Sequence, residues 1–378
     1  MDQIVDLKLN KNKIIHRLIP WLILGVVVLG AYFALRSDAW FYQKPVGQVI
    51  SVKKIAQNHT TDTYDNHATV TDQQVLVKIL NRRHQSQITI SNTYDTSQVL
   101  NQQLKVGMQI FLDHQSHQAW GFKSVKRDAT WLPFLAFIFG ALMILMRRAG
   151  RLTILSVLLN TIIFSLTIWF DVNFGSGAIV ILFLGFAIFV AILTLGLVMG
   201  FRNRQTWVIF ATVMTATLAA LGLAMLVFWI TGKHGLHLEL LEFITQLPGP
   251  MFFAMTLVGV LGAVMDESTD MIATLFTLKK ETPNVTSTTL IQAGRNVGQE
   301  IFGALINVLL LIFIAAQIPM AILYLRNGNN IGYTYDMNMA LGMTQTLISA
   351  IGIVLTVPAG ILWVLIDNWF ARRVRENK

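Results

Sequence analysis

Long apolar runs recur along most of this sequence, and they limit the folds that are open to it. Each run holds close to the ~20 residues that an α-helix needs to cross a lipid bilayer. The composition agrees, because 54% of the 378 residues are hydrophobic and only 13% are charged, against roughly a quarter in soluble domains. The sequence therefore predicts a polytopic α-helical membrane protein. We place eight runs, at residues 18–35, 131–146, 152–170, 179–199, 207–230, 251–278, 301–325 and 344–366.

The basic residues predict on which side of the membrane each loop lies. Lys and Arg accumulate in cytoplasmic loops, and here they collect at alternate connections, leaving only Lys233 and Arg326 in the other short loops. Both termini are therefore predicted to be cytoplasmic, including a basic tail at 371–378. Topology and attraction to anionic lipid explain the net charge of +9, so the lipid bilayer is an expected partner and nucleic acid is not. The basic residues used are Lys8, Lys11, Lys13, Arg17, Arg147, Arg148, Arg151, Arg202, Arg204, Lys279, Lys280, Arg295, Arg372, Arg373, Arg375 and Lys378.

The segment between the first two runs, residues 37–130, differs in texture from the rest. Stretches such as VGQVISVKKI and QQVLVKIL alternate apolar and polar residues, a period that is typical of half-buried strands. We expect a small extracytoplasmic β domain here, either a barrel or a sandwich. It would follow a cytoplasmic N-terminus and anchor helix at 1–36 and precede a helical bundle at 131–370. We interpret its scattered histidines as solvated, with no metal site: His59, His67, His84, His114 and His117.

The stretch GAVMDESTDMIATLF places three acids inside the sixth apolar run. At 100° per residue, Asp266 and Asp270 share one stripe of a helix with Gly259 and Gly262, while Glu267 lies at the margin of that stripe. Small residues let a neighbouring helix approach closely, so we expect the stripe to face another helix. Like charges one turn apart raise each other's pKa, which suits a proton-accepting or cation-binding pair.

Acids at membrane depth require an explanation, because each costs at least ~2.5–3.5 kcal/mol on insertion scales. Such residues usually face interior cavities and mark the path of an ion or substrate. The alternative is that the sixth helix leaves the membrane near Met265 and the acids lie in a solvated cytoplasmic extension. The residues that follow the acids are largely apolar until Lys279, which favours burial.

The seventh helix is predicted to carry a complementary face. One of its stripes is small and polar, and Arg295 lies a quarter turn away from it. Packed against the sixth helix, this stripe would enclose carboxylates, amides and one guanidinium in a common compartment. Its members are Asn296, Gln299, Glu300, Gly303 and Asn307.

The stretches MGFRNRQTW, GAVMDESTDMIATL and AGRNVGQEIFGALINVLLL, with the anchor helix and β-rich segment before them, resemble the YibE/F-like family of bacterial membrane proteins. The resemblance covers nearly the whole chain and is strongest from Trp131 onward. It implies a multi-pass protein of the bacterial cytoplasmic membrane and a paired paralogous subunit that lacks the outer domain; a homo-oligomer is the other assembly we consider. It implies no activity. Members commonly have small or apolar residues between the acids, so Glu267 is an addition here.

The absence of known catalytic motifs from the sequence favours a permease over an enzyme. The sequence has no Gly-rich phosphate loop, no HExxH, no Ser–His arrangement and no cysteine, so neither catalytic residues, a cofactor nor a metal site is expected. The leading prediction is a secondary permease coupled to a proton or cation at Asp266 and Asp270, with the polar residues of the seventh helix along its path. The alternative is a non-transporting accessory subunit whose outer domain binds a partner or an envelope component.

Overall fold

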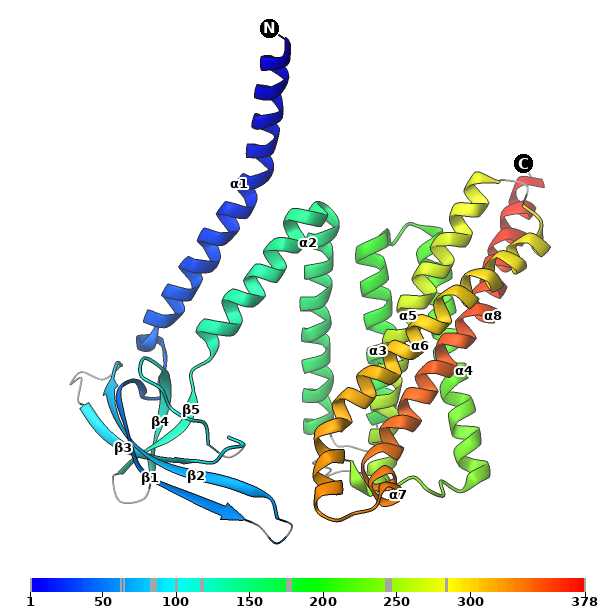
Figure 1. The fold of residues 1–378 in the computed structure, drawn as a ribbon. Coiled ribbons are helices and arrows are strands. Elements are labelled where there is room, and N and C mark those ends of the chain that lie inside the picture. Colours follow the sequence, from blue (N-terminus) through cyan, green and yellow to red (C-terminus); the bar gives the residue numbers. More distant parts are fainter. Residues whose placement is uncertain are drawn as a thin grey trace. The chain divides into compact units, whose positions relative to one another are not determined.

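The computed structural model describes residues 2–61, 63, 65–81, 87–98, 101–115, 119–174, 179–241, 247–282 and 285–376. The chain divides into two compact units, Met1–Arg151 and Leu152–Lys378, and each is treated separately below (Figure 1). Within the described residues, seven helices are long and apolar enough to cross a membrane. The predicted helical class with a small antiparallel sheet near the N-terminus is therefore confirmed.

The eight predicted runs all lie within these helices, because one helix contains two of them. Helix α2 (Asp128–Phe174) is interrupted at Arg147, which has φ 49° and ψ −112°. This conformation lies outside the helical region and breaks the direction of the chain. The predicted runs at 131–146 and 152–170 fall on either side of the break. The first half of α2 belongs to the first unit and the rest to the second.

The first unit contains helix α1 (Asp2–Ser37), a short 3₁₀ turn η1 (Ala39–Phe41), the sheet and the start of α2. All paired strands are antiparallel, in the order β3-β2-β1-β4-β5. Strands β3 and β5 also lie close together, so the sheet curls into a partly open barrel. Its core comprises Val49, Val75, Val77, Ile79, Ile90, Leu104, Ile110 and Leu112. The strands are β1 (Val46–Thr61), β2 (His67–Ile79), β3 (Gln87–Tyr94), β4 (Gln109–Gln115) and β5 (Ala119–Val125).

A buried ion cluster ties the end of α1 and the start of α2 to the sheet. The ammonium of Lys126, whose side chain is 1% exposed, lies 2.8 Å from Asp38 Oδ1 and 2.8 Å from Asp128 Oδ2. The hydroxyl of Tyr42 donates to Asp128 Oδ2 at 2.5 Å, and this bond raises the pKa of Tyr42. Burial alone would raise the pKa of Asp128, but the hydrogen bonds from Lys126 and Tyr42 outweigh it and lower that pKa. The cluster therefore favours the charged form of Asp128.

The second unit is a helical bundle centred on α5 (Pro248–Glu281), which packs against α3, α4 and α8, while α6 packs mainly on α8. Side chains define several helix starts: Asn203 accepts from the backbone N–H of Gln205 at the start of α4, and Thr286 accepts from that of Thr289 before α6. The other elements are α3 (Ile179–Leu195), the π-helical η3 (Gly196–Gly200), α4 (Arg204–Thr231), η4 (Leu238–Leu240), α6 (Ser287–Arg326), α7 (Ile331–Thr334), the π-helical η5 (Tyr335–Met339) and α8 (Ala340–Glu376).

Candidate functional site

The acidic segment of α5 places one acid in the bundle and leaves two at the surface. Glu267 is 1% exposed and Ser268 is fully buried, whereas Asp266 and Asp270 are exposed. Within this chain the packed face of α5 is therefore not the predicted one: Glu267, expected at the margin, is the buried carboxylate. The cause is the apolar surface of α5, which decides the buried face and whose buried members are Phe252, Leu257, Val260, Leu261, Val264, Met271, Ile272 and Leu275.

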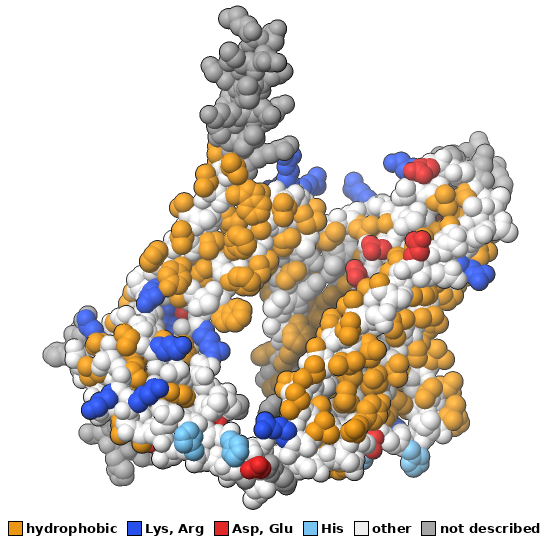
Figure 2. Space-filling model, in the orientation of Figure 1, with side chains coloured by type: hydrophobic (Ala, Val, Ile, Leu, Met, Phe, Trp, Pro, Cys, Tyr) orange, Lys and Arg blue, Asp and Glu red, His pale blue; other side chains and the backbone are white. Residues whose placement is uncertain are grey.

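The small-residue stripe of α5 does not meet another helix closely within this chain. A Cβ atom added at Gly262 would have nothing within 4 Å, and one at Gly259 would meet only Ser349 Oγ at 3.8 Å and Gln345 Nε2 at 3.9 Å. The predicted helix-packing role of these two glycines is thus not fulfilled by the described residues. Figure 2 shows acidic side chains among hydrophobic ones on the surface of the second unit.

Glycines of α8 make the close approach to α5 instead. A Cβ at Gly352 would lie 2.8 Å from Val260 Cγ1, and one at Gly360 would lie 3.0 Å from Met271 Cε. These two contacts lie at successive heights of parallel helices. Glu267 falls between them, seven residues after Val260 and four before Met271, on the same face of α5. The buried carboxylate therefore occupies the tightly packed interface between α5 and α8.

Helix α6 also approaches α8 through glycines, and this turns its polar stripe outward. A Cβ at Gly298 would lie 2.4 Å from Val357 Cγ2, and one at Gly294 would lie 2.7 Å from Ile361 Cγ1. Gly303 is open, with nothing within 4 Å. The predicted polar compartment between this helix and α5 is therefore not formed by the described residues. The predicted polar residues of α6 are all exposed: Arg295, Asn296, Gln299, Glu300 and Asn307.

Part of this outward stripe does line a shared hollow. Arg295, Asn296 and Gln299 border a depression of about 430 Å³ on the surface of α6, together with Thr288 and Gln292. The structure thus brings three of the predicted residues together, in a hollow that no acid of α5 lines. Glycines buried against α8 account for this, because they lie on the opposite side of α6 from the polar stripe.

Neither carboxylate oxygen of Glu267 has a hydrogen-bond partner among the described residues. The same holds for the buried hydroxyls of Ser268 on α5 and Thr217 on α4. A buried carboxylate without a partner costs several kcal/mol when charged, and a neutral one still costs about 1–3 kcal/mol. Such a group is stable only when it holds a proton or a bound cation. This residue is therefore the centre of the candidate site.

A cavity of about 470 Å³ opens at one end of the bundle, where α5 and α8 begin. Its polar lining includes Gln317, Asp336, Asn338 and Gln345, and the π-helical η5 supplies two of these residues. Gln345 is also one of the two side chains nearest to Gly259, which lies eight residues before Glu267, or about 12 Å along the helix. Polar groups thus reach from this cavity toward the buried acid.

At the other end of the bundle, Asp367 of α8 joins three helices. Its carboxylate lies 2.9 Å from Lys279 Nζ of α5 and 3.3 Å from Arg204 Nε of α4. The sequence pattern predicts no role for Asp367. The signal that could have found it is its place at the end of an apolar run, level with the basic ends of two neighbouring helices.

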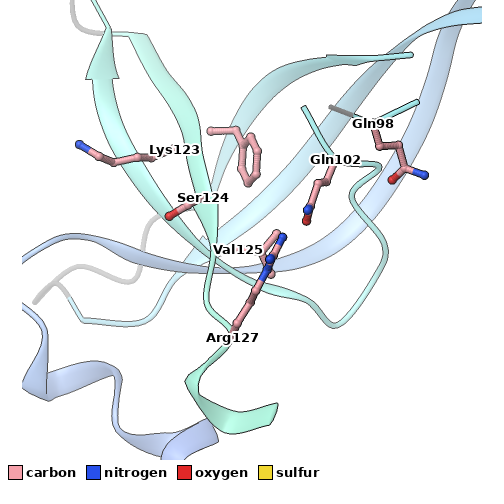
Figure 3. A pocket seen from close by; sticks show the side chains of 7 residues that line it. Gln98, Gln102, Lys123, Ser124, Val125 and Arg127 are labelled. Atoms are coloured by element: carbon pink, nitrogen blue, oxygen red, sulfur yellow. The ribbon is translucent and has the colours of Figure 1, made fainter. Parts of the chain in front are cut away.

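The β domain carries a separate polar pocket of about 380 Å³, shown in Figure 3. Gln102 and Arg127 extend toward the same space there, while Lys123 points away from it. Of the five histidines, His59 contacts the hydroxyl of Thr69 and His67 that of Thr61; the positions of His84 and His117 and the side chain of His114 lie outside the described part. Among the described residues, no group of three or more His, Cys, Asp or Glu is arranged to hold a metal ion.

Comparison with known proteins identifies the family. The model of the YibE/F-like protein family matches residues 134–366, and that of the YibE/F family N-terminal domain matches residues 40–125. The chain belongs to the YibE/F-like family. The first match covers the bundle with Glu267, and the second covers the β domain. No curated protein and no solved structure matches the chain.

Proposed function

We propose that this YibE/F-like protein is a secondary permease that couples transport to a proton or a cation at Glu267. The observation that carries the proposal is the buried carboxylate with no hydrogen-bond partner among the described residues. Ionisable groups at membrane depth usually serve ion or substrate pathways. Loading and release of a proton or cation would change the cost of burying this group by several kcal/mol, which is enough to drive a bundle between two states.

The polar cavity at the start of α5 and α8 supplies the entrance in this proposal. Gln345 and Ser349 border Gly259, and Thr356 of α8 is buried further along. These residues recur every four or seven positions on α8, so they lie on one face of that helix. A substrate or ion entering the cavity would follow this face toward Glu267.

Asp266 and Asp270 take part as the outer members of the site, covered by a second subunit. They are exposed on α5, and carboxylates are too costly to leave against lipid. The open stripe around Gly262 would receive a helix of that subunit, and the polar stripe of α6 would line the path beside it. The family resemblance points to a paralogue without the outer domain as this subunit; a second copy of the chain is the other arrangement.

The proposal includes eight spans in the bacterial cytoplasmic membrane with both termini in the cytoplasm. The chain has no cysteine, so single cysteines report sidedness cleanly. In intact cells, Asn58→Cys and His234→Cys should react with a membrane-impermeant maleimide, whereas Glu281→Cys should react only after permeabilisation. All three side chains are exposed. Labelling of Glu281→Cys from outside would contradict this topology.

Transport itself is tested by comparing uptake and efflux of metabolites and ions in cells with the wild-type chain, with Glu267→Gln and with neither, each with the paired subunit present. We expect at least one solute to follow the wild-type protein in a way that depends on the proton or cation gradient. The glutamine variant should lose this dependence, because it cannot exchange a proton or balance a cation. Equal fluxes in all three strains would refute the permease.

The polar pocket of the β domain supports the second candidate, a non-transporting accessory subunit. Arg127 and Gln102 extend into its space (Figure 3), and donors of this kind suit an extracytoplasmic partner or envelope component. In that case, cells with Arg127→Ala would behave like cells without the protein, whereas cells with Glu267→Gln would behave like those with the wild-type chain. If the protein is a permease, Glu267→Gln should instead cause a larger loss of function than Arg127→Ala.

A further inference from the structure

A second polar cleft lies in the first unit, where the β domain meets the ends of its two helices. It has a volume of about 410 Å³. We call it the basal cleft, and define it by Tyr32 and Arg36 of α1, Lys105 and Met108 before β4, and Ala129 and Thr130 of α2. It is separate from the pocket in Figure 3 and from the bundle with Glu267.

Hydrogen bonds hold the guanidinium of Arg36 at this cleft. Its Nη1 donates to the hydroxyl of Tyr32 at 2.7 Å, and its Nη2 donates to the carbonyl of Gly107 at 3.1 Å. A guanidinium has five N–H donors, so donors remain for a ligand. The carbonyl of Arg36 also accepts from Gln109 Nε2 at 2.7 Å, which fixes the end of α1 against the domain.

The cleft is lined by basic side chains and by no carboxylate. Lys105 forms no side-chain hydrogen bond or ion pair with the described residues that would neutralise it. Lys126, in contrast, is buried between Asp38 and Asp128, whose two carboxylates outnumber its single charge. Figure 2 shows that Lys and Arg side chains gather on the β domain. The free positive charge of the cleft therefore resides on Arg36 and Lys105.

The position of the cleft along the helices places it at the level of lipid headgroups. Arg36 directly follows the apolar run at 18–35, and Thr130 directly precedes the run at 131–146. Large aromatic side chains are exposed at the same level: Trp40 is 80% exposed, and Trp131 is 61% exposed. Aromatic residues are enriched at the membrane–water interface. This placement holds on whichever side of the membrane the domain lies.

We propose that the basal cleft binds the phosphate of an anionic phospholipid. Arg36 and Lys105 would contact the phosphate oxygens as hydrogen-bond donors, and Met108 and Ala129 would border the glycerol. The acyl chains would lie along the exposed apolar surfaces of α1 and α2, which begin at the same cleft. A free phosphate would satisfy the charge alone, whereas the headgroup depth and the apolar helix surfaces favour a lipid. The bound lipid would fix the β domain at the membrane surface.

The test is native mass spectrometry of the full-length chain in detergent, titrated with phosphatidylglycerol and, separately, with phosphatidylcholine. We expect the wild-type chain to prefer phosphatidylglycerol, and Arg36→Gln/Lys105→Gln to bind it roughly tenfold more weakly, because each basic group near the surface adds to the attraction. The matched control is Lys53→Gln/Lys54→Gln, which removes the same charge from exposed positions on β1 and should bind as the wild-type chain does.

The remaining measurements either support the lipid site or overturn it. Equal affinity for both lipids, or equal loss in the two double variants, would overturn it. Full competition by millimolar inorganic phosphate would show a free-phosphate site and overturn the lipid assignment. Lys105→Gln alone serves if the double variant is misfolded, because the Lys105 side chain makes no hydrogen bond or ion pair with the part of the chain that the structure describes. Arg36→Lys, which keeps the charge, should retain most of the lipid binding.

Discussion

Replacing Glu267 with methionine should stabilise the bundle and abolish gradient-coupled transport. The substitution removes a buried carboxylate that lacks hydrogen-bond partners among the described residues and leaves a flexible apolar side chain that fits irregular spaces. Replacing an uncompensated buried polar group in this way should raise the free energy of unfolding by about 1–3 kcal/mol. The melting temperature in detergent should rise by about 2–10 °C, measured with a thiol-independent fluorescence assay.

The matched control for this prediction is Asp270→Asn, three residues away on the exposed side of α5. Exposed substitutions usually change stability by under about 0.5 kcal/mol, so its melting temperature should stay close to that of the wild-type chain. A lower melting temperature for Glu267→Met would mean that the carboxylate has a stabilising partner. Normal coupled transport by the methionine variant would remove Glu267 from the mechanism.

Gly298→Leu should greatly reduce the amount of folded protein. A Cβ at this position would lie 2.4 Å from Val357 Cγ2, closer than two carbon atoms can approach, and leucine adds three further carbons. Overpacking of this kind costs about 3 kcal/mol or more, because α6 must move away from α8. The measurements are the monodisperse fraction on size-exclusion chromatography and the melting temperature of what remains.

Gly303→Leu is the control on the same helix, because a Cβ atom there would meet nothing within 4 Å. It should leave the amount of folded chain unchanged, and equal losses at both glycines would contradict the packing of α6 on α8. Gly262→Leu distinguishes the folding of the single chain from its association with a second subunit. It should also fold, since the position is open, but it should weaken association with the subunit that we propose covers α5.

Much of the architecture follows from local patterns in the sequence. Apolar runs of bilayer length specify helices wherever they occur, since backbone groups in lipid must pair within the segment. Alternation with period two predicted strands β1 to β4, because it creates one face for a core. The sequence predicted a turn between residues 146 and 152, but not that the break is confined to Arg147 while its neighbours remain helical. It also did not reveal that Lys126 is buried between two aspartates. Both depend on what surrounds them.

The candidate site, too, was predicted from the sequence only in part. The sequence determined that three acids lie within one apolar helix, and its spacing already contained two further signals. Glu267 follows Val260 and Val264 at seven and three residues, on the apolar face, and Gly352, Thr356 and Gly360 repeat every fourth residue, as closely packed helices do. Only the tertiary structure decided between the two faces of α5. The apolar face buries more surface, and α8, about 90 residues away in the chain, supplies the glycines that fit it. Glu267 lies on the apolar face of α5 and is buried with it, whereas Asp266 and Asp270 lie on the other face and remain exposed.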